Sequence, residues 1–240
     1  MLTPLDHVVV ALITILLPVH DLLFWYPRLV RAAAERLRNA RHRAYFQSLT
    51  TEWALLAATL AAWAIQSRGW SDLGFRAPSG WGFWTALVLA AGFAVFVGRQ
   101  RVNLVREVDD EARATVLAHL EPLRPLLPHT RRELVHFSAL SVTAGICEEV
   151  LFRGFVIWYL RALVPPIPAI LLASLLFGMA HAYQGTRGVG QTALVGLGMA
   201  ILYTVSGSLW VPMLLHAFID LNSGLLAYAF LRREARVAPV

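Results

Sequence analysis

Seven apolar runs dominate this 240-residue sequence, and each is near the length of a membrane-spanning helix. A helical span takes about 20 mostly apolar residues, and lipid accepts only backbone whose polar groups bond internally. The hydrophobic content of 58% also exceeds that of ordinary soluble domains. The predicted spans are Leu5–Tyr26, Glu52–Gln66, Trp81–Gly98, His136–Leu163, Ile167–Tyr183, Val189–Val205 and Leu209–Leu231. The sequence therefore predicts an all-α, polytopic transmembrane helix bundle.

Two of these runs leave the number of helices open. Glu52–Gln66 is short, and its helix can begin as early as Phe46. The last run is interrupted by Asp220, Asn222 and Gly224, which can divide it into two segments. We therefore expect seven or eight helices.

Arginines are concentrated on one side of the predicted topology. That side carries Arg28, Arg31, Arg36, Arg38, Arg41, Arg43, Arg99, Arg101, Arg106, Arg113, Arg124, Arg131, Arg132, Arg187, Arg232, Arg233 and Arg236. The opposite side has only Arg68, Arg76 and Arg161. Because positively charged loops stay in the cytoplasm, we predict a multi-pass protein of the cell membrane with its N-terminus outside and its C-terminus cytoplasmic.

The charge pattern also excludes one class of partner. A net charge of +6 is compatible with nucleic-acid binding, but the arginines flank apolar runs and form no compact basic domain. The expected partners are the lipid bilayer and a substrate, and no nucleic acid. The sequence has no lysine and is rich in alanine, leucine and valine, which indicates GC-rich coding typical of a bacterial source.

The sequence divides into three parts. Residues 1–135 hold the first three spans and a cytoplasmic linker, in which an interfacial helix is predicted. Residues 136–231 hold the remaining spans and the polar motifs described next. Residues 232–240 form a predicted cytoplasmic tail.

Three charges lie near the middle of the fourth span, in the stretch ICEEVLFRGF. Placing a charge at the centre of a membrane helix costs roughly 3 kcal/mol of insertion free energy. Charged residues at this depth are therefore candidates for a functional role. Glu149 and Arg153 are four residues apart and can pair on one helix face, whereas Glu148 points about 100° away. A purely structural ion pair is as well supported for Glu149 and Arg153 as direct chemistry. Glu148 has no local partner and is the candidate general base.

Later spans add two histidines. His181 follows Phe177 by four residues near a helix end, where a lone histidine is more often packed or interfacial than catalytic. His216 and Asp220 are four residues apart, a spacing typical of a metal-ligand or hydrogen-bonding pair. Polar groups on separate helices in lipid must face one another or a water-filled space. We therefore predict an intramembrane polar cavity shared by these helices.

These residues resemble the CPBP family of intramembrane proteases, which contains CAAX prenyl proteases and bacteriocin-processing or bacteriocin-immunity (Abi) proteins. The three family motifs occur in order as Glu148, Glu149 and Arg153, then Phe177 and His181, then His216 and Asp220. The resemblance covers about Phe137–Gly224. It implies that residues 136–231 form a catalytic core, and that the protein is an endopeptidase acting on a membrane-associated or peptide substrate.

The resemblance also implies a role for each motif residue. Glu148 activates a water molecule, which His181 holds and orients. His216 and Asp220 stabilise the tetrahedral oxyanion. The supporting residues are Glu149, Arg153 and Phe177.

One motif position departs from the prenyl proteases, which have asparagine where this sequence has Asp220. An ionised carboxylate cannot donate a hydrogen bond to an oxyanion. Asp220 is therefore protonated, or orients a cationic His216, or belongs to a metal site. The Glu/His/His/Asp set could bind zinc, although no HExxH motif is present. We expect glutamate-activated water with no obligatory cofactor, and a divalent metal such as zinc is the alternative.

Two other functions are compatible with the sequence. The protein can be a non-catalytic membrane scaffold or an immunity-type protein of the same family, which keeps the polar cluster for stability. It can also be a small transporter or proton relay that uses intramembrane carboxylates, but the sequence has no internal repeat typical of transporters.

The motif residues do not reach one depth on straight helices. At 1.5 Å per residue, Glu148 lies roughly 18 Å from the inner end of its predicted span, and His181 roughly 20 Å from the outer end of its own. His216 lies about 10 Å from the outer end of its span. We therefore predict a tilt, a break, or a fourth span that begins nearer Ala139.

Overall fold

The computed structural model describes residues 1–35, 39–107 and 109–237, and every regular element in these ranges is helical. α1 (Pro4–Ala11), α2 (Leu17–His20) and α3 (Tyr26–Ala34) join into one N-terminal helix through π-helical segments at Leu12–Leu16 and Asp21–Trp25. The others are α4 (Ala40–Ile65), α5 (Gly80–Glu107), α6 (Asp110–Leu120), α7 (Arg131–Glu148), α8 (Ile157–Arg161), α9 (Pro166–Ala180), α10 (Gly185–Ser206) and α11 (Trp210–Val237). Counted as continuous helices, the described elements number eight, and the predicted all-α bundle is confirmed.

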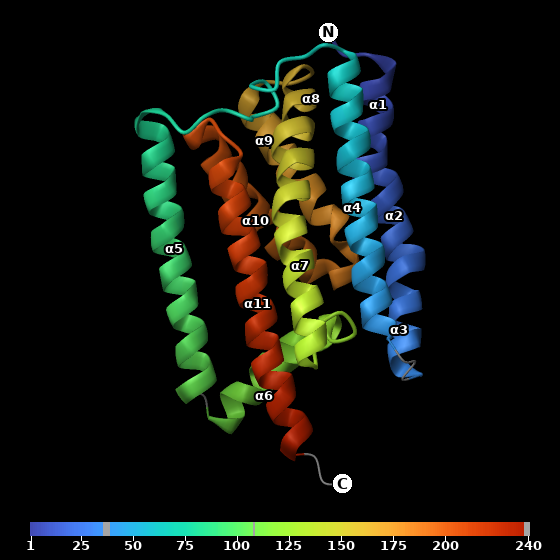
Figure 1. Ribbon diagram of the computed structural model, residues 1–240, viewed down its shortest axis with the longest axis vertical. Coiled ribbons are helices and arrows are strands. Elements are labelled where there is room, and N and C mark those ends of the chain that lie inside the picture. The colour runs from blue at the N-terminus through green and yellow to red at the C-terminus, as the bar shows by residue number, and fades with distance from the viewer. Residues whose placement is uncertain (36–38, 108, 238–240) are drawn as a thin grey trace.

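The helices stand side by side along the long axis of the molecule, and α6 lies across one end (Figure 1). Among the described residues, five helices are long and apolar enough to cross a membrane. They are Pro4–Ala34, Ala40–Ile65, Gly80–Glu107, Ala182–Ser206 and Trp210–Arg232. The chain is therefore a multi-pass membrane protein.

The arginine-rich segments gather at one end of the bundle. The end of α3, the start of α4, the end of α5, α6 and the end of α11 lie at the lower end of Figure 1, whereas the N-terminus lies at the upper end. The N-terminus and the end of α11 thus lie at opposite ends of the bundle, and the assignment of the arginine-rich end to the cytoplasm stays a prediction. Arg36 and Arg38 lie outside the described residues, as do residues 238–240 of the predicted tail and the side chains of Arg233 and Arg236.

One predicted helix boundary is wrong, and one alternative that the sequence left open is not observed. α4 begins at Ala40, not at Glu52 or Phe46, because the polar residues in its first half line a cavity instead of ending the helix. α11 runs unbroken through its polar positions. Asn222 is buried against protein, and Gly224 lies where an added Cβ would come within 2.5 Å of the Phe137 ring, so neither breaks the helix.

The fourth helix also begins earlier than predicted. A capping box starts α7: the Thr130 hydroxyl accepts from the Glu133 backbone N–H at 3.2 Å, and the Glu133 carboxylate accepts from the Thr130 N–H at 2.9 Å. The predicted starts at His136 or near Ala139 are therefore wrong. The predicted break is present, because Glu149–Val156 is π-helical between α7 and α8.

The helices that carry the first and third motifs are in close contact. An ideal Cβ at Gly145 of α7 would lie 2.7 Å from the backbone nitrogen of Ala217 on α11. Small residues allow membrane helices to approach at this distance. α7 also packs against α4, so the bundle is continuous across residue 135. The predicted division at residues 135 and 231 stays a prediction.

We expect Gly145→Val to destabilise the protein, because a side chain there must push α7 and α11 apart. Overpacking of this kind costs about 1–3 kcal/mol. Gly198→Val on α10 is the matched control, because an added Cβ at Gly198 meets nothing within 4 Å. Thermal unfolding in detergent should show a lower Tm for Gly145→Val only. Equal shifts for the two variants would contradict the proposed close contact.

Candidate active site

A buried charge network forms the base of the site. Glu149 is 0% exposed and Arg153 is 2% exposed. Arg153 Nη1 lies 3.0 Å from Glu149 Oε1, and Arg153 Nη2 donates to the Gly196 carbonyl oxygen at 3.2 Å. The Arg153 guanidinium also stacks on the Phe177 ring, 4.2 Å from its centroid. The predicted ion pair between Glu149 and Arg153 is therefore present.

Hydrogen bonds fix the orientation of both histidines. Nδ1 of His216 lies 2.7 Å from Glu149 Oε1, so this nitrogen carries the proton that the carboxylate accepts. Nδ1 of His181 lies 2.9 Å from the Phe177 carbonyl oxygen, to which it donates. The Phe177 ring contacts both imidazoles, with centroids 4.9 Å from His181 and 6.0 Å from His216. Each histidine consequently presents its Nε2 atom to the site.

Glu148 faces both Nε2 atoms. Its Oε2 atom lies 3.9 Å from His181 Nε2 and 3.8 Å from His216 Nε2. Both distances exceed hydrogen-bond length, and Oε2 has no hydrogen-bond partner among the described residues. Separations of this size can be bridged by one water molecule.

Asp220 lies beside this group. Its Oδ2 atom is 3.7 Å from His216 Nε2, too far for a direct hydrogen bond, and its side chain is 37% exposed. Glu148 and Asp220 are thus both near the same imidazole nitrogen. All seven residues of the three motifs are brought together by the fold.

The shortness of α9 explains how His181 reaches the same depth in the bundle as Glu148. With 15 residues this helix is about 22 Å long, shorter than the roughly 30 Å hydrocarbon core. It ends at Ala180, and the chain turns at His181 and returns as α10. His181 therefore lies within the bundle, where it meets Glu148.

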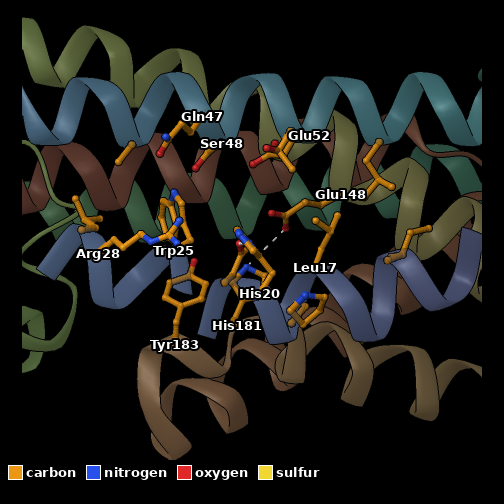
Figure 2. Close-up of a pocket in the computed structure, with 18 of the residues that line it drawn as sticks. Leu17, His20, Trp25, Arg28, Gln47, Ser48, Glu52, Glu148, His181 and Tyr183 are labelled. Atoms are coloured by element: carbon orange, nitrogen blue, oxygen red, sulfur yellow. Dashed lines mark hydrogen bonds and ion pairs between the residues drawn. The ribbon is translucent and has the colours of Figure 1, made fainter. Parts of the chain in front are cut away.

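A cavity of about 600 Å³ opens beside Glu148 and His181. Its opposite walls come from the N-terminal helix and α4, and Figure 2 shows His20, Trp25, Gln47, Ser48 and Glu52 on them. A cavity is present, and Glu148 and His181 line it as predicted, whereas His216 and Asp220 are not among its lining residues. The sequence analysis missed the lining residues on the N-terminal helix and α4. The available signal was Glu52, which is an intramembrane carboxylate once α4 is taken to begin at Ala40.

The described carboxylates and imidazoles of the site do not form a metal-binding arrangement. In the part of the chain that the structure describes, no group of three or more His, Cys, Asp and Glu side chains has the arrangement of a metal site. Glu149 holds His216 through Nδ1, and Asp220 stands 3.7 Å from Nε2. The distances between Glu148, His181 and His216 match a bridging water.

A comparison with protein-family models gives one finding. The model of the family described as "Type II CAAX prenyl endopeptidase Rce1-like" matches residues 130–222. No curated protein and no solved structure matches the chain. The matched segment contains all three motifs, so the predicted resemblance is confirmed, and a function of the CAAX-type intramembrane protease kind is supported.

Proposed function

We propose that the protein is an endopeptidase that hydrolyses a peptide bond of its substrate within the helix bundle, and the match of residues 130–222 to the Rce1-like family model supports this proposal. The observation that carries this proposal is the position of Glu148, whose free oxygen faces Nε2 of two oriented histidines. The substrate is a peptide or a membrane-associated protein. We place the enzyme in the cell membrane, with its arginine-rich end and C-terminus in the cytoplasm.

In this mechanism Glu148 is the general base. A water molecule between Glu148 and His181 gives a proton to the carboxylate and donates its second hydrogen to His181 Nε2, which is free to accept because Nδ1 is bonded to Phe177. The hydroxide formed attacks the scissile carbonyl carbon. Glu148 then passes the proton to the departing nitrogen and the C–N bond breaks, which gives a carboxylic acid and an amine. The acid then loses its proton to the amine or to solvent, so the products leave as a carboxylate and an ammonium group.

His216 is the proposed oxyanion donor. To donate from Nε2 it must be an imidazolium, because Nδ1 already carries a proton toward Glu149. Carboxylates near both nitrogens stabilise that cation: Glu149 on Nδ1, with Glu148 and Asp220 near Nε2. Asp220 then acts through the charge on His216 and has no need to touch the oxyanion. This role resolves the departure from asparagine at position 220.

We expect hydrolysis to need no divalent metal. Peptide cleavage by the purified protein should keep its rate after dialysis against EDTA and in the presence of 1,10-phenanthroline. A loss of activity that added zinc restores, with an unchanged Tm, would instead assign Glu148, His181 and His216 to a catalytic metal site.

The experiment that tests the proposed function in cells compares protein termini. Membranes from cells that express the wild type, Glu148→Gln or His181→Ala are digested, and new peptide termini are quantified by mass spectrometry. The proposal predicts termini that depend on wild-type protein and disappear in both variants at equal expression. An identical set of termini in all three samples would contradict it.

The second candidate is a non-catalytic scaffold or immunity-type protein of the same family. The buried Glu149–Arg153–His216 network favours it, because such a network can be retained for packing alone. A scaffold keeps its cellular role in Glu148→Gln and loses it in variants that disturb helix packing, such as Gly145→Val. An endopeptidase instead loses its cellular role in Glu148→Gln.

A further inference from the structure

A further carboxylate faces the candidate active site from the opposite wall of the cavity. Glu52 lies near the middle of α4, one of the helices long and apolar enough to cross a membrane. It lines the same cavity as Glu148 and His181. In Figure 2 its side chain points from α4 into the cavity, on the side where Glu148 lies. Ionisable groups at this depth are costly and are associated with function.

Glu52 has no counter-charge in the described part of the chain. Its Oε2 atom is buried without a hydrogen-bond partner, and no ion pair joins it to a described basic residue. Asp21, on the same cavity, differs because its carboxylate lies 3.0 Å from His20 Nδ1. The charged groups that act electrostatically on Glu52 are the carboxylates of Glu148, Asp220 and Asp21. This part of the cavity is consequently acidic.

The two described arginines that line the cavity lie away from Glu52. Arg28 is at the far end of the cavity from Glu52 in Figure 2. Arg43 precedes Glu52 by nine residues on α4, which places their backbones about 13 Å apart along the helix. Neither arginine on the cavity lining is placed to pair with Glu52, so a cationic group of a bound molecule can take that position.

We propose that Glu52 is a specificity residue that binds the lysine or arginine side chain of a peptide substrate, close to the scissile bond. This inference rests on the proposed function. An ion pair in a space of low dielectric is stronger than one in water, and an acidic substrate side chain would be repelled by the same carboxylates. Leu55 and Phe152 also line the cavity and offer apolar contacts to the long stem of a basic side chain.

The test uses the purified full-length protein and a peptide library prepared from a bacterial proteome with a glutamate-specific protease. One half of the library is acetylated on lysine, which removes the positive charge. We expect the wild type to prefer sites with a basic residue within three positions of the cleaved bond by about tenfold, equivalent to roughly 1.4 kcal/mol. Acetylation should remove the preference for lysine, and Glu52→Gln should remove the preference for both basic residues.

The matched control is Glu111→Gln on α6, which alters an exposed carboxylate away from the cavity and should keep the preference. The inference is overturned if Glu52→Gln keeps the wild-type preference, or if it slows cleavage of all peptides by one factor. Either result is compatible with the proposed function, provided that Glu148→Gln abolishes cleavage. An absence of cleavage by the wild type overturns both. The acetylated library tests the charge preference on wild-type protein, whatever the folding of the variants.

Discussion

Glu148→Gln is expected to lower the rate of peptide hydrolysis by about 10²–10⁴-fold, the usual contribution of a general base. Glutamine keeps the size of the side chain and can still contact a water, but it cannot accept the proton. Glu148 makes no hydrogen bond to a described residue through Oε2, so its replacement removes no structural contact there. The loss should therefore appear in kcat with little change in Tm. Initial rates on cleaved library peptides measure the effect.

Glu111→Gln serves as the control for this variant, because its carboxylate is exposed on α6 and lines no part of the cavity. It should cleave at the wild-type rate. A Glu148→Gln protein that is folded and retains more than about a tenth of wild-type kcat would be inconsistent with a general base at this position.

Arg153→Met is expected to destabilise the protein by about 3–5 kcal/mol, the usual cost of removing one partner from a buried ion pair. The substitution removes the guanidinium from the Glu149 carboxylate, which is 0% exposed and keeps only His216 as a partner among the described residues, and it removes the bond to the Gly196 carbonyl. The thioether side chain fills much of the space against Phe177. Loss of charge should therefore dominate over loss of volume. Thermal unfolding in detergent, followed by a probe of tertiary structure, measures the change.

The double variant Glu149→Met/Arg153→Met is the informative control. With both charges removed, no unpaired carboxylate stays buried, and we expect part of the lost stability to return. A single variant as stable as the wild type, or a double variant no more stable than the single one, would show that the pair does not stabilise the fold. Neither result would bear on whether Glu148 is a base.

Local spacing accounts for the part of the arrangement that could be predicted. Each motif holds two residues four positions apart, a spacing that brings side chains together on a helix. The pairs are Glu149 and Arg153, Phe177 and His181, and His216 and Asp220. The requirement that lipid satisfies no polar group then brings the pairs together. The all-α bundle and the shared cavity could be predicted for the same reason.

Contacts between helices account for the features that could not be predicted from the sequence. A hydropathy window counts the polar residues at the start of α4 against a span, although several of them line a cavity inside the bundle. Glu52 was consequently taken for a helix end. The sequence left open whether Asn222 and Gly224 divide the last helix. The burial of Asn222 and the close packing of Gly224 on Phe137, which accommodate them, have no local signal. The π-helical segment after Glu148 has no signal in hydrophobic periodicity.

The roles assigned to the site rest on one chemical step, the attack of a water molecule that Glu148 has deprotonated. A single turnover of excess purified protein on a cleaved peptide in H₂¹⁸O tests this step most directly. Mass spectrometry then locates the isotope in the product and in the protein. The account predicts one ¹⁸O atom in the new carboxylate of the product and none in the Glu148 side chain. Label in Glu148, or a product without ¹⁸O, would show a covalent acyl intermediate and contradict the account.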